Sequence, residues 1–245
     1  MRWAYGVTTV PKRRCDLLPK TLASLCAAGF DSPRLFIDGA RNGIEWEKFN
    51  LAITLRWPTI RTYGNWILGL AELYIREPEA DRYAMFQDDF VTYRNLRSYL
   101  EKSPYPDKGY LNLYTFPSNQ LLAPAGERER ARGNWFQSRN LDSGRDYHGQ
   151  RQQTGRGAVA LVFNRMAVQS LITHQHMVDR PMDVTWGWRK VDGGIVEAMN
   201  KAGFREYVHD PSLTQHVGRI STMGSRPHKE AITFRGEDFD ATEML

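Results

Sequence analysis

The order of hydrophobic and polar positions in the first half of the chain predicts alternating strands and helices. Runs of β-branched and aromatic residues mark strands at 4–10, 34–40, 51–57 and 82–90. Residues 16–30 and 65–77 repeat apolar side chains at helical spacing, and Asp16 and Gly29 are suited to begin and end the first helix. Strands that alternate with helices indicate βαβ units and a mostly parallel sheet, which is the α/β class of fold.

Apolar spacing also predicts which side chains of the two helices face the core. The expected core contacts are Leu18, Leu22, Leu25 and Cys26 in the first helix, and Leu68, Leu70, Leu73 and Tyr74 in the second.

The second half of the chain has a less regular pattern. Strands are predicted at 109–116 and 157–165, helices at 165–175 and 192–204, and a closing segment at 206–218. Residues 118–156 lack apolar periodicity and are rich in Arg, Asn, Gln and Gly, so we interpret them as a mobile loop that serves the acceptor, a lid or disorder. We therefore expect one domain over residues 1–224, followed by a polar tail at 225–245.

Composition and charge narrow the classes of protein. The chain has 245 residues and is 41% hydrophobic, and its longest apolar run, "GAVALVF", is far shorter than the ~20 residues of a membrane span. No signal peptide precedes the first strand, so we expect a cytoplasmic protein that keeps Cys15 and Cys26 as free thiols. The net charge of +5, carried mainly by arginine, indicates an anionic partner or an arginine-rich proteome.

Two adjacent aspartates interrupt a hydrophobic stretch in "YAMFQDDF", residues 83–90. Burying both carboxylates is costly unless they are paired or solvated. Open α/β sheets bind ligands at the carboxyl ends of their strands, so we expect Thr8, Thr9, Asp38, Asp88 and Asp89 to line one ligand site. Carboxylates suit Mg²⁺ or Mn²⁺. The alternative is that the aspartates cap a turn or pair with arginines.

His216 lies in "HDPSLTQHVGRIST", residues 209–222, where no structural need for an imidazole is evident. One imidazole with one or two carboxylates is a suitable ligand set for Mn²⁺. The alternative is a structural histidine that hydrogen-bonds within the fold.

Together these segments resemble the metal-dependent glycosyltransferases of the GT-A fold. "QDD" at 87–89 takes the place of the D-x-D or E-D-D motif that ends the family's fourth strand. "PSLTQHVG" at 211–218 is similar to a P-S-L-x-Q-H-x-G segment near the end of the catalytic domain of the N-acetylglucosaminyltransferase IV family. The resemblance covers residues 3–224 in layout and these two motifs in detail. It implies a GT-A-like single domain that moves a sugar from a UDP-sugar, such as UDP-glucose or UDP-N-acetylglucosamine, to an acceptor hydroxyl.

The resemblance also implies roles for individual residues. Asp89 and His216 would bind Mn²⁺ or Mg²⁺, and Asp88 would contact the metal through water or contact the ribose. Gln87 departs from the acid that usually opens the family motif. The remaining nucleotide contacts would be Thr8, Thr9 and Asp38 to the base and ribose, and Arg13 of the basic loop 12–14 to the diphosphate.

An inverting transfer requires a general base for the acceptor hydroxyl. Asp192 begins the predicted helix 192–204, at the place of the family's catalytic carboxylate, and Gly193 and Gly194 leave space beside it. A helix N-terminus favours the ionised form of a carboxylate. Asp183 is the second candidate, and a simple capping role is the alternative for Asp192.

The arginine-rich segment 126–156 indicates an anionic acceptor. The residues expected to bind it are Arg128, Arg130, Arg132 and Arg139 for phosphates, and Trp135, Phe136, Trp186 and Trp188 for stacking on an extruded base. In layout and charge the chain also resembles, more loosely, the phage glycosyltransferases associated with TET-like oxygenases. That resemblance implies DNA containing 5-hydroxymethylcytosine as acceptor and action in the host cell cytoplasm. The alternatives are a saccharide or small-molecule acceptor, a nucleotidyltransferase, and a non-catalytic nucleic-acid-binding protein.

Overall fold

The computed structural model describes residues 1–116, 130–132, 134–138, 157–178, 191–218 and 230–245. A central sheet contains, in spatial order, β3 (Ile53–Arg56), β2 (Arg34–Asp38), β1 (Trp3–Thr9), β4 (Arg82–Gln87), β9 (Ala160–Asn164), β6 (Gly109–Asn112), β10 (Arg205–His209), β8 (Trp135–Gln137) and β7 (Arg130–Arg132). A second, small sheet pairs β5 (Phe90–Thr92) with β11 (Thr214–His216).

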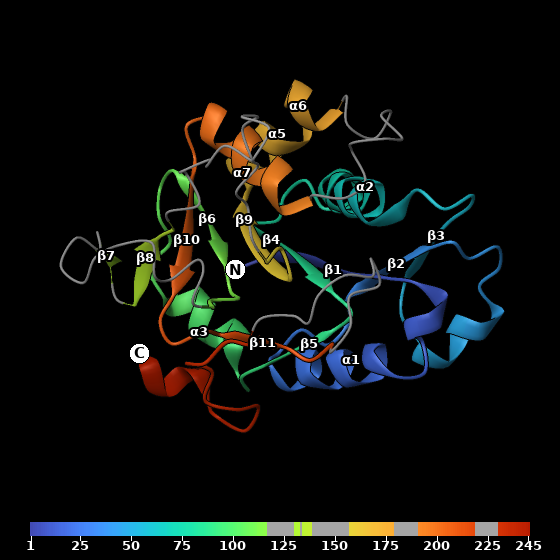
Figure 1. Cartoon of the computed structure of the whole chain (residues 1–245), viewed down its shortest axis with the longest axis horizontal. Coiled ribbons are helices and arrows are strands. Elements are labelled where there is room, and N and C mark those ends of the chain that lie inside the picture. The colour runs from blue at the N-terminus through green and yellow to red at the C-terminus, as the bar shows by residue number, and fades with distance from the viewer. Residues whose placement is uncertain (117–129, 133, 139–156, 179–190, 219–229) are drawn as a thin grey trace, which may run out of the picture.

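Helices cover both faces of the central sheet (Figure 1). One layer consists of α2 (Arg61–Arg76), α5 (Arg165–Ile172), α6 (Gln175–Val178) and α7 (Val191–Lys201). The other side carries α1 (Leu17–Ala27), α3 (Leu96–Lys102) and the small sheet. Short 3₁₀ turns complete the described elements: η1 (Pro11–Arg13), η2 (Ile44–Phe49) and η4 (Ala241–Met244).

Most strands of the central sheet point the same way. β3, β2, β1 and β4 pair in parallel, as do β6 and β10. β9 is antiparallel to both of its neighbours, β4 and β6, and β8 is antiparallel to β10 and β7. Among the described strands of this sheet, only β9 and β8 therefore run against the others. The predicted α/β fold, with a mostly parallel central sheet flanked by helices, is confirmed.

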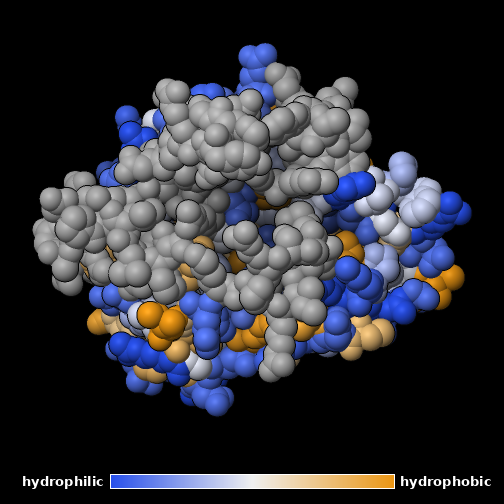
Figure 2. All heavy atoms as spheres, viewed as in Figure 1, coloured by the Kyte–Doolittle hydropathy of each residue, from blue (hydrophilic) through white to orange (hydrophobic). Residues whose placement is uncertain are grey.

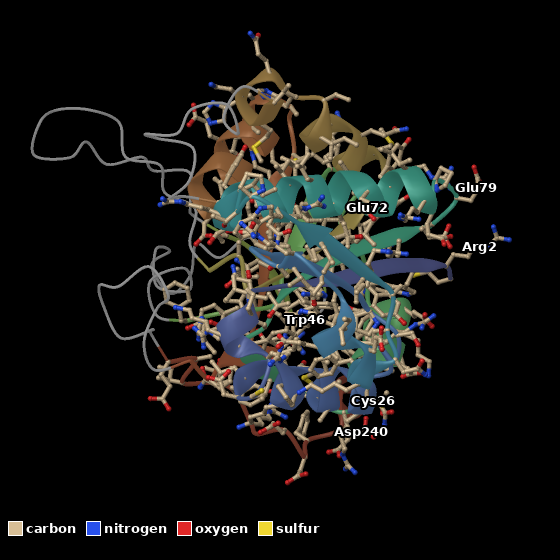
Figure 3. The ribbon with its side chains drawn as sticks, turned by 90° about the vertical axis from the view of Figure 1, so that its right-hand side faces the viewer. Arg2, Cys26, Trp46, Glu72, Glu79 and Asp240 are labelled. Atoms are coloured by element: carbon tan, nitrogen blue, oxygen red, sulfur yellow. The ribbon has the colours of Figure 1, made fainter. Side chains whose placement is uncertain are left out.

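Alternation along the central strands divides the core between the two layers. In β4, Ala84 and Phe86 pack on the α1 side, and Tyr83 and Met85 pack on the α2 side, because successive side chains of a strand point to opposite faces. Figure 3 looks onto the β3 edge and shows the two sides of that division, with Glu72 on α2 above and Trp46 below.

Two expected core contacts on the helices are wrong. Leu70 and Leu73 of α2 are buried as predicted, but Leu68 is 45% exposed because it points away from the sheet. On α1, Leu18 and Leu25 are buried, whereas Cys26 is exposed. Both cysteines are free thiols, as expected.

The C-terminal segment differs from the polar tail expected at 225–245. Residues 230–245 fold back against the body of the protein, where Phe234 and Phe239 pack on the ring of Tyr93 at centroid distances of 4.8 and 5.0 Å. Ala241 is fully buried. The two phenylalanines are separated by charged residues, so the sequence shows no periodic apolar face.

Residues 118–156 were expected to be one irregular loop. The described part of this segment contains the antiparallel pair β7–β8, which extends the central sheet beyond β10. Trp135 of β8 anchors it, because its indole NH donates a hydrogen bond of 2.7 Å to Ser103.

The outer edge of β5 is completed by side chains of α1 rather than by another strand. Thr21 donates a hydrogen bond to the carbonyl of Phe90 and accepts one from its NH, at 2.9 and 3.2 Å. Ser24 accepts a hydrogen bond of 2.8 Å from the NH of Thr92. Two hydroxyls thus hold the strand that follows Asp88 and Asp89 against the helix.

No helix in the described ranges is long and apolar enough to cross a bilayer. On the face shown in Figure 2, the coloured hydrophobic residues form separate patches among hydrophilic ones.

His209 is a fully buried histidine at the end of β10. Its Nδ1 lies 2.6 Å from the carbonyl of Pro211, and its Nε2 lies 2.6 Å from the hydroxyl of Tyr99. The carbonyl can only accept, so Nδ1 carries the proton, and the Tyr99 hydroxyl donates to Nε2. Burial lowers the pKa of His209 from 6.5 to about 4.

We expect this histidine to weaken the protein in mild acid. Between pH 6.5 and 4 the unfolded chain takes up a proton at His209 that the folded chain does not, so the free energy of unfolding falls as the pH falls. The full shift corresponds to roughly 3 kcal/mol. Urea denaturation at pH 7 and pH 4.5 measures the loss. His209→Gln, which takes up no proton, should show a smaller loss between these pH values, and equal losses in the two proteins would contradict the assignment.

Candidate metal and nucleotide site

The carboxyl ends of β1, β2 and β4 meet at one edge of the sheet. In the parallel register Thr8 stands beside Gln87, and Thr9 stands beside Ile37. The hydroxyl of Thr9 donates a hydrogen bond of 2.6 Å to Asp88, directly after β4. The hydroxyl of Thr8 donates instead to the carbonyl of Phe86, at 3.2 Å. The sheet therefore brings Thr9 and Asp88 together, whereas the side chain of Thr8 points to the opposite face of β1. The expected contacts of these residues with a nucleotide stay predictions.

Asp38, at the end of β2, organises the start of α2. Its carboxylate accepts hydrogen bonds from the hydroxyl of Thr59 at 2.5 Å, and from the NH groups of Ile60 and Arg61 at 2.8 Å each. These contacts give Asp38 a structural role at the helix N-terminus. Its predicted contact with the ribose stays a prediction.

Asp89 and His216, which are far apart in the sequence, are in contact. Pairing of β11 with β5 places His216 opposite Phe90, and the NH of Val217 donates a hydrogen bond of 2.9 Å to the carbonyl of Asp89. His216 Nε2 then lies 3.4 Å from Asp89 Oδ1, and both side chains are buried. Gly218 permits this approach, because a Cβ there would lie 3.1 Å from His216 and 3.2 Å from Asp89.

Arg13 approaches the same carboxylate from the other side. It comes from η1, in the turn after β1, and its guanidinium lies 3.6 Å from Asp89 Oδ2. Arg13 is buried despite its charge. The guanidinium therefore offsets part of the cost of burying two neighbouring carboxylates.

Burial sets the protonation of this group. Desolvation, together with the charge of Asp89, raises the pKa of Asp88 to about 7. Desolvation, together with the charge of Arg13, lowers the pKa of His216 to about 4. His216 is therefore a neutral imidazole at pH 7, which is the form that binds a metal ion.

The Asp89–His216 pair fits a divalent ion. Two ligand atoms that are each about 2.1 Å from one ion, at a right angle, are roughly 3.0 Å apart. The observed distance of 3.4 Å between His216 Nε2 and Asp89 Oδ1 corresponds to a somewhat wider angle between the two ligand atoms at the ion. Within the described ranges no cluster of three His, Cys, Asp or Glu side chains has the spacing of a metal site. Such a two-ligand set suits Mg²⁺ or Mn²⁺, which commonly take their other ligands from water and substrate phosphates.

Asp192 lies at the same edge of the sheet, in the first turn of α7. Its carboxylate accepts a hydrogen bond of 2.7 Å from the NH of Gly157. The carbonyl of the next residue, Ala158, accepts a hydrogen bond of 3.1 Å from the side chain of Gln87, at the end of β4. Burial raises the pKa of Asp192 above its ordinary value.

Tyr114 lies near His216 and near Gly157, the residue whose NH binds Asp192. Its ring lies 6.1 Å from the ring of His216, between centroids, and it is buried. On its other side, a Cβ added to Gly157 would lie 2.7 Å from the Tyr114 ring. Sequence reasoning missed Tyr114 and Gly157. A glycine that opens the apolar run "GAVALVF" was the available signal, since such a glycine often marks close approach by another group.

Other predicted residues fall outside the site or outside the described residues. Asp183, Trp186 and Trp188 lie outside the described residues, as do Arg128 and Arg139. Trp135 is 1% exposed and packs against His209, with ring centroids 4.8 Å apart. The prediction that Trp135 stacks on an extruded base is wrong, because the ring is part of the core.

No protein-family model matches the chain, and neither does any curated protein. Solved structures are similar over most of its length. One is described as mannose-1-phosphate geranyltransferase from Thermus thermophilus, with a TM-score of 0.49, 14% identity, and coverage of 85% of this chain and 74% of that one.

Two further structures are similar to the chain. A putative glucose-1-phosphate thymidylyltransferase from Bacillus anthracis has a TM-score of 0.48 and 9% identity, and covers 87% and 89% of the two chains. A nucleoside-diphosphate-sugar pyrophosphorylase from Vibrio cholerae has a TM-score of 0.47 and 10% identity, and covers 86% and 94%. These last two names describe nucleotidyl transfer, and none of the three describes a glycosyltransferase. At this level of similarity they carry no argument about what the chain does.

We expect Gly157→Ala to destabilise the protein and to disturb the site. Gly157 has a φ of +75°, and the new methyl group would overlap the Tyr114 ring. Strain and overlap together should cost about 2–4 kcal/mol of unfolding free energy. Gly203→Ala is the matched control, because φ is +82° there but no atom lies within 4 Å of the added Cβ. Urea denaturation compares the two, and an equal loss would show that the Tyr114 contact carries no cost.

Proposed function

We propose that the protein is a metal-dependent glycosyltransferase, which transfers a sugar from a UDP-sugar to an acceptor hydroxyl. The contact between Asp89 and His216 is the observation that carries the proposal. A buried, neutral imidazole against a carboxylate at the carboxyl edge of a parallel sheet is suited to hold a divalent ion beside a diphosphate.

Each residue of the site has a distinct task in this reaction. Asp89 and His216 would hold Mn²⁺ or Mg²⁺, and Arg13, which is paired with Asp89, would contact the diphosphate. Thr9 fixes the orientation of Asp88 through their hydrogen bond. The bound metal would stabilise the negative charge that develops on the departing diphosphate.

Asp192 is the proposed general base. The acceptor oxygen forms a bond to the anomeric carbon, while the bond from that carbon to the diphosphate oxygen breaks and its electron pair leaves with UDP. The proton of the acceptor hydroxyl passes to the Asp192 carboxylate. A raised pKa makes this carboxylate a stronger base as long as it is ionised, and its position in the first turn of α7 favours ionisation.

Nucleotidyl transfer is the second candidate function. It would use a nucleoside triphosphate and a sugar phosphate at the same edge of the sheet, with the same metal. The Asp89–His216 pair would serve this reaction as well, because a divalent ion can also stabilise the charge on a departing pyrophosphate. The product separates the two reactions, because glycosyl transfer releases UDP and nucleotidyl transfer releases pyrophosphate.

The proposed acceptor is DNA containing 5-hydroxymethylcytosine. Its support is the net charge of +5 and the arginine-rich composition of residues 126–156. Arginines there would neutralise phosphates, so the affinity for DNA would fall steeply with salt. Trp135 is in the core, so Phe136 is the remaining candidate for stacking on the base among the described residues. Its side chain is partly exposed.

One experiment tests the function, the acceptor and the metal together. The protein is incubated with Mn²⁺ and UDP-glucose or UDP-N-acetylglucosamine, in parallel with UTP and a sugar 1-phosphate. Acceptors are matched DNAs containing cytosine or 5-hydroxymethylcytosine, and free saccharides. We expect UDP release and a sugar-mass increase on the hydroxymethylated nucleoside, measured by mass spectrometry after digestion.

EDTA should abolish this transfer, and Asp89→Ala should do the same without lowering the melting temperature appreciably. Pyrophosphate release from UTP would instead support nucleotidyl transfer. Transfer to saccharides alone would refute the DNA acceptor, and full activity in EDTA would refute the metal site.

We expect Asp192→Asn to lower the turnover number by roughly 10²- to 10⁴-fold, the usual contribution of a general base. The amide keeps an oxygen for the NH of Gly157 but cannot accept a proton. Calorimetric titration with UDP and Mn²⁺ should give unchanged binding. An unchanged turnover number would exclude Asp192 as the base.

A further inference from the structure

Trp57 is placed unlike the other tryptophans in the described part of the chain. Trp46, Trp66 and Trp135 are at most 1% exposed and Trp3 is partly buried, whereas Trp57 is 55% exposed. It follows directly after β3, and the guanidinium of Arg41 lies 4.1 Å from its ring centroid. Arg41 comes from the segment after β2, so two neighbouring strand ends contribute one cation–aromatic pair.

The pair stands at the ligand edge of the sheet. Asp38 is beside Arg56 in the parallel register of β2 and β3, and the NH of Gly39 donates a hydrogen bond of 2.9 Å to the Arg56 carbonyl. Trp57 therefore continues the chain at the same edge as Thr9 and Asp88. In Figure 3 Arg2, which precedes β1, lies on the right, so this carboxyl edge is toward the left.

Trp57 is also expected on the same face of the central sheet as the pair of Arg13 and Asp89. Ile53 and Leu55, at alternate positions before Trp57, pack into the core on the α1 side. Arg13 reaches Asp89 from the turn between β1 and α1, on that same side.

The spacing fits a nucleotide that spans the strand ends. The order β3-β2-β1-β4 puts three strand intervals between Trp57 and the aspartates, which is about 14 Å at the usual spacing. This is comparable to the length of an extended nucleoside diphosphate. With the diphosphate at Asp89, Arg13 and His216, the base would reach the end of β3.

We propose that Trp57, with Arg41 on its ring, is the stacking platform for the base of the donor nucleotide. The proposal rests on the proposed function. Every nucleobase has a π-face, and stacking on an aromatic ring contributes substantially to the binding of a base. Arg41 lies over one face of the Trp57 ring and holds it in place, and the base would stack on the exposed part of the indole that Arg41 leaves open.

The test compares a ligand that has a base with one that lacks it. Calorimetric titrations with UDP and with inorganic pyrophosphate, each with Mn²⁺, are made on the wild type, Trp57→Ala and Trp57→Phe. Ile75→Ala is the matched control, because Ile75 is also apolar and is 74% exposed but lies on α2, away from the strand ends. Melting temperatures confirm that every variant is folded.

We expect Trp57→Ala to weaken UDP binding by roughly 5- to 150-fold and to leave pyrophosphate binding unchanged. Trp57→Phe should retain most of the UDP affinity, and Ile75→Ala should retain all of it. Addition of UDP should also quench tryptophan emission in the wild type and quench it less in Trp57→Phe.

Three results would refute the proposal that Trp57 stacks on the base. Wild-type UDP affinity in Trp57→Ala would refute it and leave the proposed function standing. Equal loss of UDP and pyrophosphate binding would show that Trp57 acts on the metal site instead. Absence of binding of both probes to the wild type would refute the proposed function, and the platform with it.

Discussion

The candidate site depends on the pairing of two short strands that are more than 100 residues apart in the chain. β5 follows the two aspartates, β11 ends in His216, and the antiparallel register sets His216 against Phe90. Side chains alternate between the faces of a strand, so a slip of one residue would turn the imidazole away from Asp89. The contact between Asp89 and His216 is therefore a property of backbone register, and neither residue could be exchanged for a neighbour in the sequence.

Charge balance is the second constraint on this region. Asp88 and Asp89 are both buried, at 8% and 7% exposure, and each must be compensated. Asp88 accepts a hydrogen bond from the hydroxyl of Thr9, and Arg13 and His216 lie on either side of the Asp89 carboxylate. The raised pKa of Asp88 shows that this compensation is incomplete. A divalent cation at the proposed site would complete it.

Much of the fold, and part of the candidate site, could be predicted from the sequence. Runs of β-branched and aromatic residues located β1 to β4, and helical spacing located α1 and α2. The topology of parallel strands then placed Thr9 beside Asp88. Contacts that depend on packing could not be predicted. No local pattern shows that Asp38 holds the start of α2, that the indole of Trp135 points into the core, or that Tyr114 fills the space left by Gly157. Phe234 and Phe239 were missed because they pack singly rather than on a periodic face.

The hydroxyls of Thr21 and Ser24 have a consequence for the behaviour of the protein in solution. They occupy backbone groups on the side of β5 that β11 leaves open. An uncovered strand edge is a template for pairing with a strand from another chain, and so for aggregation. Helix α1 closes this edge with two small side chains. The two-stranded sheet that carries His216 can therefore remain short without recruiting a third strand from a neighbouring molecule.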